Sequence, residues 1–221
     1  MPYTDPVTRE QREGDVVGHF RVVTDVVTDE VGLTVQLAVE CKAGRAHPWV
    51  GFFDHERLAF SQASVNTWFK VDQSQWPGRV AERLANTFAQ LPSFDAGRAA
   101  VHVATARGDD SRNVALNAAR QSLAFARARA ARQVRYMDDP PGAVAATAVL
   151  PVVVTCAPLF SCHLNDDGGV VVESLDHFDV LIPDETGYLS RVYVRTEESF
   201  AQLALALAQL RPTLEALLPQ D

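Results

Sequence analysis

Apolar and polar residues alternate over two Val-rich segments near the start of the chain. Residues 14–23 and 31–40 both show this partial period of two, and the acidic, turn-prone sequence TDVVTDE lies between them. Such alternation is typical of β-strands, because successive side chains of a strand point to opposite faces. The pattern predicts two paired strands, followed by a third, short strand over 49–53.

Apolar residues recur at helical spacing in three other segments. Residues 76–91 carry an apolar stripe with a Pro near its start, which predicts a helix. The strongest helical signal covers 111–135, which is dense in Ala, Leu and Arg and for which Ser111 is the expected N-cap. Residues 197–210 predict a closing amphipathic helix.

The second half of the chain alternates strand and helix signals. A turn-forming sequence, DDPPG at 138–142, ends the long helix and predicts a linker. Further strands are expected over 97–106, 148–158, 169–183 (as one strand or two) and 191–195.

The length of 221 residues favours one domain. Strands come first, then helices, and then an alternation of both, which predicts a single α/β domain. We expect residues 1–137 to form its core, 138–142 to be the linker, and 143–221 to continue the same domain.

The composition is that of an ordinary globular protein, with 47% hydrophobic and 22% charged residues. A net charge of −8 argues against nonspecific adhesion of the whole molecule to nucleic acid or to an anionic membrane, so such binding would need a local patch. The three cysteines lack metal-ligand spacing, and no apolar run is long enough to span a membrane. These features predict a cytoplasmic protein without a membrane partner, and the absence of a Gly-rich phosphate loop predicts no nucleotide cofactor.

The triplet Glu40-Cys41-Lys42 ends the second predicted strand. Glu40 and Lys42 share one face of that strand, and Glu13 and Asp15 have the same spacing just before the preceding strand. If the two strands are neighbours, carboxylates and one ammonium group converge, and such a group can hold a divalent cation and orient a water. A solvated surface ion pair is the alternative interpretation. Lys is rare here, since 18 of the 20 basic residues are Arg, and an amine can act on a proton where a guanidinium cannot.

The stretch PYTDPVTREQREGDVV, followed by LAVECK, resembles the PD-(D/E)xK, or restriction-endonuclease-like, nucleases. The resemblance covers residues 3–54 and, more loosely, 111–160. It implies a mixed central sheet flanked by helices and a Mg²⁺ or Mn²⁺ cofactor. On that match Asp15 and Glu40 are metal ligands, the Cys41 carbonyl is a third ligand, and Lys42 positions or activates the attacking water.

One departure from this family lies at the start of the chain. The family core normally begins with a helix and a first strand, whereas only 14 residues precede Asp15 here. The usual first helix is therefore expected to be missing. Three explanations of the missing helix are open. The chain starts late, the layer is supplied by a partner or by the other end of the chain, or the domain is degenerate.

The predicted long helix carries the remaining candidates. Gln121 lies on a helical row with Val114, Ala118 and Phe125, and the resemblance implies that a Gln on this helix approaches the active site. A satisfied, structural amide is the alternative. The same helix carries a basic patch that could follow a phosphate backbone, or could equally be a solvated face: Arg120, Arg127, Arg129 and Arg132.

Two functional hypotheses follow from these residues. The first is a metal-dependent nuclease with Asp15, Glu40, Lys42 and Gln121 as catalytic residues, acting on DNA in preference to RNA. The second is a catalytically inactive member of the same fold that serves as an interaction or nucleic-acid-binding module. Two protein partners are compatible with these hypotheses: a second copy in a homodimer, or a protein that supplies the missing N-terminal layer.

Overall fold

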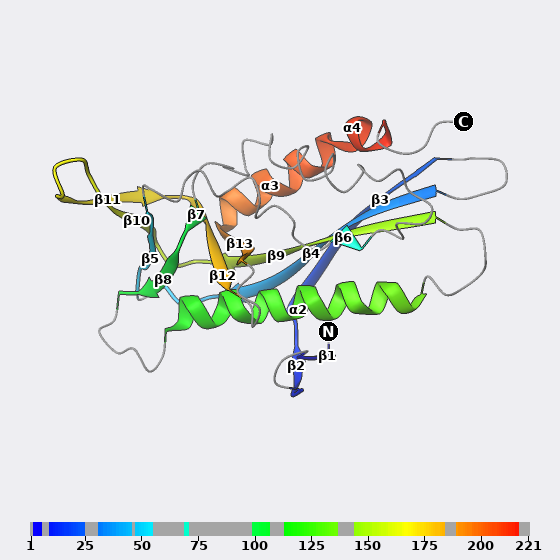
Figure 1. The fold of residues 1–221 in the computed structure, drawn as a ribbon, viewed down its shortest axis with the longest axis horizontal. Coiled ribbons are helices and arrows are strands. Elements are labelled where there is room, and N and C mark those ends of the chain that lie inside the picture. The colour runs from blue at the N-terminus through cyan, green and yellow to red at the C-terminus, as the bar shows by residue number, and fades with distance from the viewer. Residues whose placement is uncertain are drawn as a thin grey trace.

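A large mixed β-sheet with helices on both faces dominates the computed structural model (Figure 1). The structure describes residues 2–5, 9–24, 31–45, 47–54, 69–70, 99–106, 113–136, 144–183 and 189–216. Among them are the predicted strands near the N-terminus and the long helix, whereas the predicted helix over 76–91 and the linker over 138–142 lie outside the described residues.

The large sheet places strands from both halves of the chain side by side. Its order is β3 (Val16–Thr24), β4 (Val31–Lys42), β9 (Val144–Thr155), β13 (Leu189–Thr196), β12 (His177–Pro183) and β7 (Ala99–Ala100), with β6 (Phe69–Lys70) also paired to β9. Strands β3 and β4 are antiparallel, whereas β4 and β13 both run parallel to β9. The second half of the chain therefore supplies the strand at the middle of the sheet.

Two smaller sheets complete the strands of the described residues. One has the order β11 (Val170–Leu175), β10 (Leu159–Leu164), β5 (Trp49–Phe52) and β8 (His102–Thr105). The other is an N-terminal hairpin of β1 (Pro2–Thr4) and β2 (Gln11–Glu13). The sequence pattern predicted neither this hairpin nor strand β10, because neither segment shows a clear alternation.

Helix α2 (Val114–Tyr136) lies along one face of the large sheet, and α3 (Glu197–Gln209) and α4 (Arg211–Glu215) lie along the other (Figure 1). The Ala residues of α2 allow close packing: Ala115, Ala118 and Ala119 are fully buried against strand residues such as Val153 and Val192. Asn113 caps the helix, because its Oδ1 accepts the Leu116 N–H at 3.0 Å. Ser111, the cap expected from the sequence, lies outside the described residues, and the described helix begins at Val114.

The described elements agree with the expected α/β class of a mixed sheet flanked by helices. The predicted strand over 169–183 is two strands, β11 and β12. The N-terminal segment is structured as well, since the β1–β2 hairpin buries Tyr3 against α2, where the Tyr3 and Phe125 rings lie 5.0 Å apart.

Replacing Gly14 with Ala should lower the free energy of unfolding by about 1–3 kcal/mol. Gly14 is buried between the N-terminal hairpin and β3, and a β-carbon there would overlap the ring of Phe125. Urea denaturation measures the change, with Gly44→Ala as the control because a β-carbon at Gly44 meets nothing within 4 Å. Equal stability of the two variants would contradict the close packing of Gly14 on Phe125.

Candidate functional site

The chain brings Asp15 and the triplet Glu40-Cys41-Lys42 together at one end of β3 and β4. The register of the two strands places Val16 opposite Val39, and its continuation by one residue places Asp15 opposite Glu40. The Asp15 Oδ2 atom accepts a hydrogen bond from the Cys41 N–H at 2.6 Å. If the strand pair continued, the Cys41 N–H would donate to a backbone carbonyl of β3. Here it donates to the Asp15 side chain instead.

Lys42 joins this strand end to helix α2. Its Nζ donates to Glu40 Oε1 at 2.5 Å and to Gln121 Oε1 at 3.3 Å. Glu40 is only 7% exposed, while Lys42 and Gln121 are half-buried. The four residues expected to be catalytic thus lie at one place, although three of them come from the strand end and one from the helix.

Three contacts that the sequence did not indicate hold α2 against this part of the sheet. The Ser122 hydroxyl lies within hydrogen-bond distance of the Ala38 carbonyl, at 3.1 Å, and of the Val152 carbonyl, at 3.0 Å. The Tyr3 hydroxyl donates to the Gln121 carbonyl at 3.4 Å. Ser122 and Tyr3 therefore position the helical turn that carries Gln121, and no periodicity in the sequence could have identified them.

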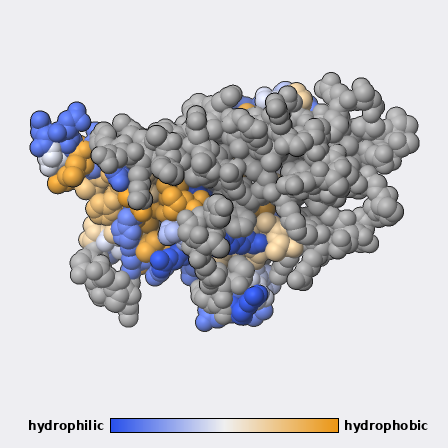
Figure 2. Space-filling view, viewed as in Figure 1, coloured by the Kyte–Doolittle hydropathy of each residue, from blue (hydrophilic) through white to orange (hydrophobic). Residues whose placement is uncertain are grey.

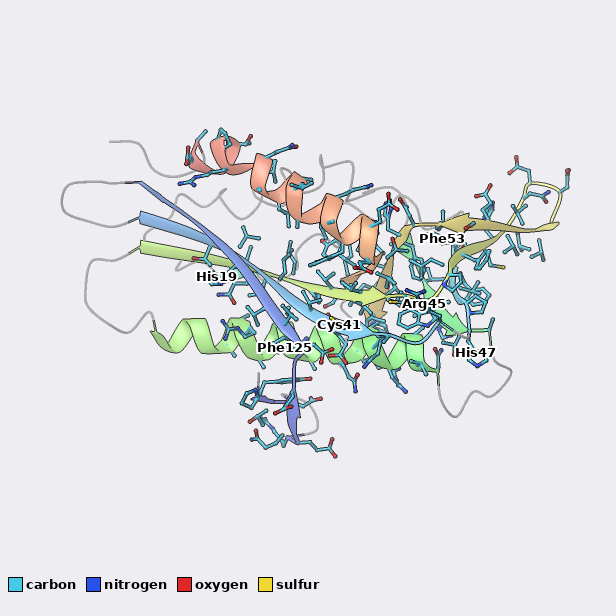
Figure 3. The ribbon with its side chains drawn as sticks, turned by 180° about the vertical axis from the view of Figure 1, so that it is seen from behind. His19, Cys41, Arg45, His47, Phe53 and Phe125 are labelled. Atoms are coloured by element: carbon cyan, nitrogen blue, oxygen red, sulfur yellow. The ribbon has the colours of Figure 1, made fainter. Side chains whose placement is uncertain are left out.

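Figure 3 views this strand end from behind, with Cys41 and Phe125 labelled. The pKa of the Cys41 thiol is raised above its ordinary value, first by burial and then by the negative charges of Asp15 and Glu40. Lys42 acts in the opposite direction, and Cys156 is a further, smaller cause of the rise. The Cys41 thiol is therefore a natural probe of the charges in the candidate site.

Alkylation of Cys41 by iodoacetamide should reach half its maximal rate above pH 9.0, the ordinary pKa of the thiol, because only the thiolate reacts. Asp15→Asn removes one negative charge beside the thiol, so it should lower the pKa and shift the rate profile to lower pH. Mass spectrometry of the Cys41 peptide measures the rate, with exposed Asp166→Asn as the control. An unshifted profile in Asp15→Asn would contradict the placement of this carboxylate.

Two carboxylates lie at the strand end, and one oxygen of each has a partner in the protein: Asp15 Oδ2 accepts from the Cys41 N–H, and Glu40 Oε1 accepts from Lys42 Nζ. Asp15 and Glu40 supply two carboxylates, which suffice for Mg²⁺ when waters and a substrate phosphate supply the other ligands. The Lys42 carbonyl accepts from the Cys156 N–H on the β9 side. Because neighbouring carbonyls of a strand point to opposite edges, the Cys41 carbonyl is directed to the Asp15 side. Across the described ranges there is no cluster of three or more His, Cys, Asp and Glu side chains suited to a metal.

Two of the other predicted residues, Glu13 and Arg129, make no contact with Lys42 that the described hydrogen bonds include. Glu13 is exposed in the N-terminal hairpin, where it pairs with Pro2. Arg129 donates from Nε and Nη2 to Gln36 Oε1, at 3.3 and 3.2 Å, and Gln36 is only 4% exposed. The contact lies farther along β4, on the same face as Glu40 and Lys42.

The basic patch of α2 is not uniformly exposed. Arg120 is exposed, Arg127 and Arg129 are half-buried, and the side chain of Arg132 lies outside the described residues. Binding of a phosphate backbone by this helix stays a prediction.

Within the described residues, no helix has the combination of length and hydropathy that a membrane crossing requires. Comparisons of the chain with family models, with curated proteins and with solved structures found no match.

Proposed function

We propose that the protein is a divalent-metal-dependent nuclease with a restriction-endonuclease-like core that hydrolyses phosphodiester bonds of DNA. The observation that carries the proposal is the position of Lys42 Nζ, between Glu40 Oε1 and Gln121 Oε1, at the strand end where Asp15 also lies. Each residue that the sequence resemblance nominated for catalysis is in this group, although Gln121 is 79 positions away from Lys42.

In this proposal Asp15 and Glu40 hold Mg²⁺ or Mn²⁺, with the Cys41 carbonyl as a further ligand. The ion supplies charge neutralisation at the phosphate and lowers the pKa of a bound water. Lys42 holds the attacking water in place through its ammonium protons, and the Gln121 carbonyl oxygen orients that ammonium group. Gln121 is a positioning residue in this scheme, since it acts through Lys42.

Binding of DNA, a polyanion, depends on the charge of the protein surface near the site. A chain with a net charge of −8 needs a local cationic surface to approach DNA, and the exposed Arg120, which directly precedes Gln121 on α2, is the candidate for a first contact. RNA is the alternative substrate, and a single-stranded RNA of the same sequence distinguishes the two.

The second candidate function is a catalytically inactive module of the same fold. It is favoured by the direct ion pair of Lys42 with Glu40, because this contact neutralises the buried carboxylate without any metal. In that case the four residues stabilise the contact between β4 and α2, and binding to another macromolecule is the function.

Nicking of supercoiled plasmid in Mg²⁺, together with thermal melting in the same buffer, tests the proposal. Wild-type protein should nick the plasmid only with the metal, and its Tm should rise with metal concentration, since a ligand at 100 times its Kd adds about 2.7 kcal/mol to the free energy of unfolding. Glu40→Gln should lose both effects. Glu173→Gln, which changes an exposed carboxylate on β11, should keep both.

Two other outcomes would overturn the nuclease. Equal nicking by wild type and Glu40→Gln would assign the cleavage to a different site or to a contaminant. A wild type that neither nicks DNA or RNA nor gains Tm with the metal would favour the inactive module.

A further inference from the structure

We infer that Phe125 is a positioning residue of the candidate site, because its ring holds the chain at Gly14 and thereby sets the position of the Asp15 carboxylate. The inference rests on the proposed nuclease for the identity of the bound ion. It also assigns a role to the N-terminal hairpin of β1 and β2, which brings a second contact to the same ring.

The Phe125 ring lies directly against the backbone of Gly14. Both residues are buried, and a β-carbon on Gly14 would overlap three atoms of the ring. Only a residue without a β-carbon comes this close to another group without a shift of the chain. Because Gly14 immediately precedes Asp15, the ring limits where the backbone of Asp15 can lie.

The N-terminal hairpin brings a second aromatic ring to Phe125. Tyr3 on β1 is paired with Arg12 on β2 and is buried, and its ring centroid lies 5.0 Å from that of Phe125. The Tyr3 hydroxyl donates to the carbonyl of Gln121, about one helical turn before Phe125. Figure 2 shows hydrophilic residues on the visible outer surface of this hairpin, so the hairpin packs on α2 through its inner side.

Asp15 depends on this support because of its place in the chain. The pairing of β3 with β4 begins at Val16, and Asp15 lies just before it. The Asp15 carboxylate nevertheless accepts the Cys41 N–H at 2.6 Å. Whether this contact forms depends on the direction in which the chain leaves Gly14, and the Phe125 ring sets that direction.

Phe125 belongs to the same helix as Gln121, so α2 contacts the candidate site from two sides. Gln121 Oε1 accepts from Lys42 Nζ at 3.3 Å, and Lys42 in turn contacts Glu40. A shift of Asp15 relative to Glu40 changes the separation of the two carboxylates, on which the affinity for the ion depends. Replacing a residue that holds a metal ligand in place typically costs about 10–100-fold in affinity.

Amide hydrogen exchange at the strand end tests the positioning without metal. The Cys41 N–H donates to the Asp15 carboxylate, whereas the Cys156 N–H donates to the Lys42 carbonyl, so the second amide is an internal reference. Phe125→Leu should speed exchange at Cys41 about tenfold more than at Cys156, the equivalent of one lost hydrogen bond to a charged group. Leu123→Val, a change in the other core cluster on α2, should leave the ratio of the two rates unchanged.

The dependence of the Tm on Mg²⁺ concentration gives the second readout, with each variant compared with its own Tm without metal. Phe125→Leu should raise the Kd for Mg²⁺ by about 10–100-fold, and Leu123→Val should keep the wild-type Kd. Gly14→Ala displaces the chain from an intact Phe125 ring and should reproduce both effects. Gly44→Ala is its control, because a β-carbon there meets nothing within 4 Å.

A loss of stability in Phe125→Leu and Gly14→Ala with an unchanged exchange ratio would overturn the inference and leave the ring as a core contact only. If Phe125→Leu does not fold, Gly14→Ala decides on the same ratio. A wild type whose Tm does not respond to Mg²⁺ would overturn the nuclease alone, because the exchange ratio is measured without metal.

Discussion

Replacing Asp179 with Asn should lower the free energy of unfolding by about 3–5 kcal/mol, because the change leaves two buried guanidinium groups without their carboxylate partner. Asp179 Oδ2 lies 3.1 Å from Arg191 Nη1, and Asp179 Oδ1 lies 2.9 Å from Arg195 Nη1. All three side chains are at most 2% exposed, so water cannot replace the lost interactions. Urea denaturation followed by tryptophan fluorescence measures the change.

Asp176→Asn is the matched control for this prediction. Asp176 is on the same part of the chain and pairs with His177, but its side chain is 60% exposed. We expect a change within about 0.5 kcal/mol for this variant. A similar loss of stability in both variants would show that burial of the ion cluster is not the cause.

Replacing Lys42 with Met should reduce the rate of DNA cleavage by about 10²-fold, the usual cost of misplacing a reacting group, here the attacking water. Met keeps most of the length of the side chain and removes the ammonium group that contacts Glu40 and Gln121. Initial rates of plasmid nicking, compared at equal concentrations of folded protein, measure the effect.

Two further variants separate catalysis from stability in this experiment. Arg211→Met removes an exposed cation on α4 that forms an i,i+4 pair with Glu215, and it should leave the cleavage rate unchanged. Gln121→Leu should reduce the rate less than Lys42→Met, because it removes only the contact that orients the ammonium group. Cleavage by Lys42→Met at the wild-type rate would exclude Lys42 from the reaction.

The candidate site was predictable because it depends on local geometry. Strands β3 and β4 are neighbours in the sequence as well as in the sheet, and their antiparallel register follows from two alternating segments. That register is enough to place Asp15 opposite Glu40, and the period of two places Lys42 on the same face as Glu40. Gln121 was predicted from the family resemblance and from its place in an apolar helical row, and its contact with Lys42 is a tertiary one.

The buried ion cluster had a sequence signal that was not used. In Arg191-Val-Tyr-Val-Arg195, the period of two places both Arg residues and Tyr193 on one face of β13 and the two Val residues on the other. Burial of the charged face could not be predicted from this pattern, because alternation normally indicates that the polar face meets water. Pairing with β12 supplies Asp179 opposite Tyr193, and this makes the burial possible.

The sequence by itself determined the local features of this protein: the β3–β4 pair, the long helix α2 with its dense Ala residues, and the Asp, Glu and Lys at one strand end. Each of these depends on spacing within a few residues or across one neighbouring connection. Only the tertiary structure decided that β9 lies between β4 and β13, that Tyr3 and Ser122 hold α2 over the site, and that Gly14 lies against the ring of Phe125. The physical reason is that these features depend on contacts between distant segments, and many pairings of the same apolar strands satisfy the same local pattern.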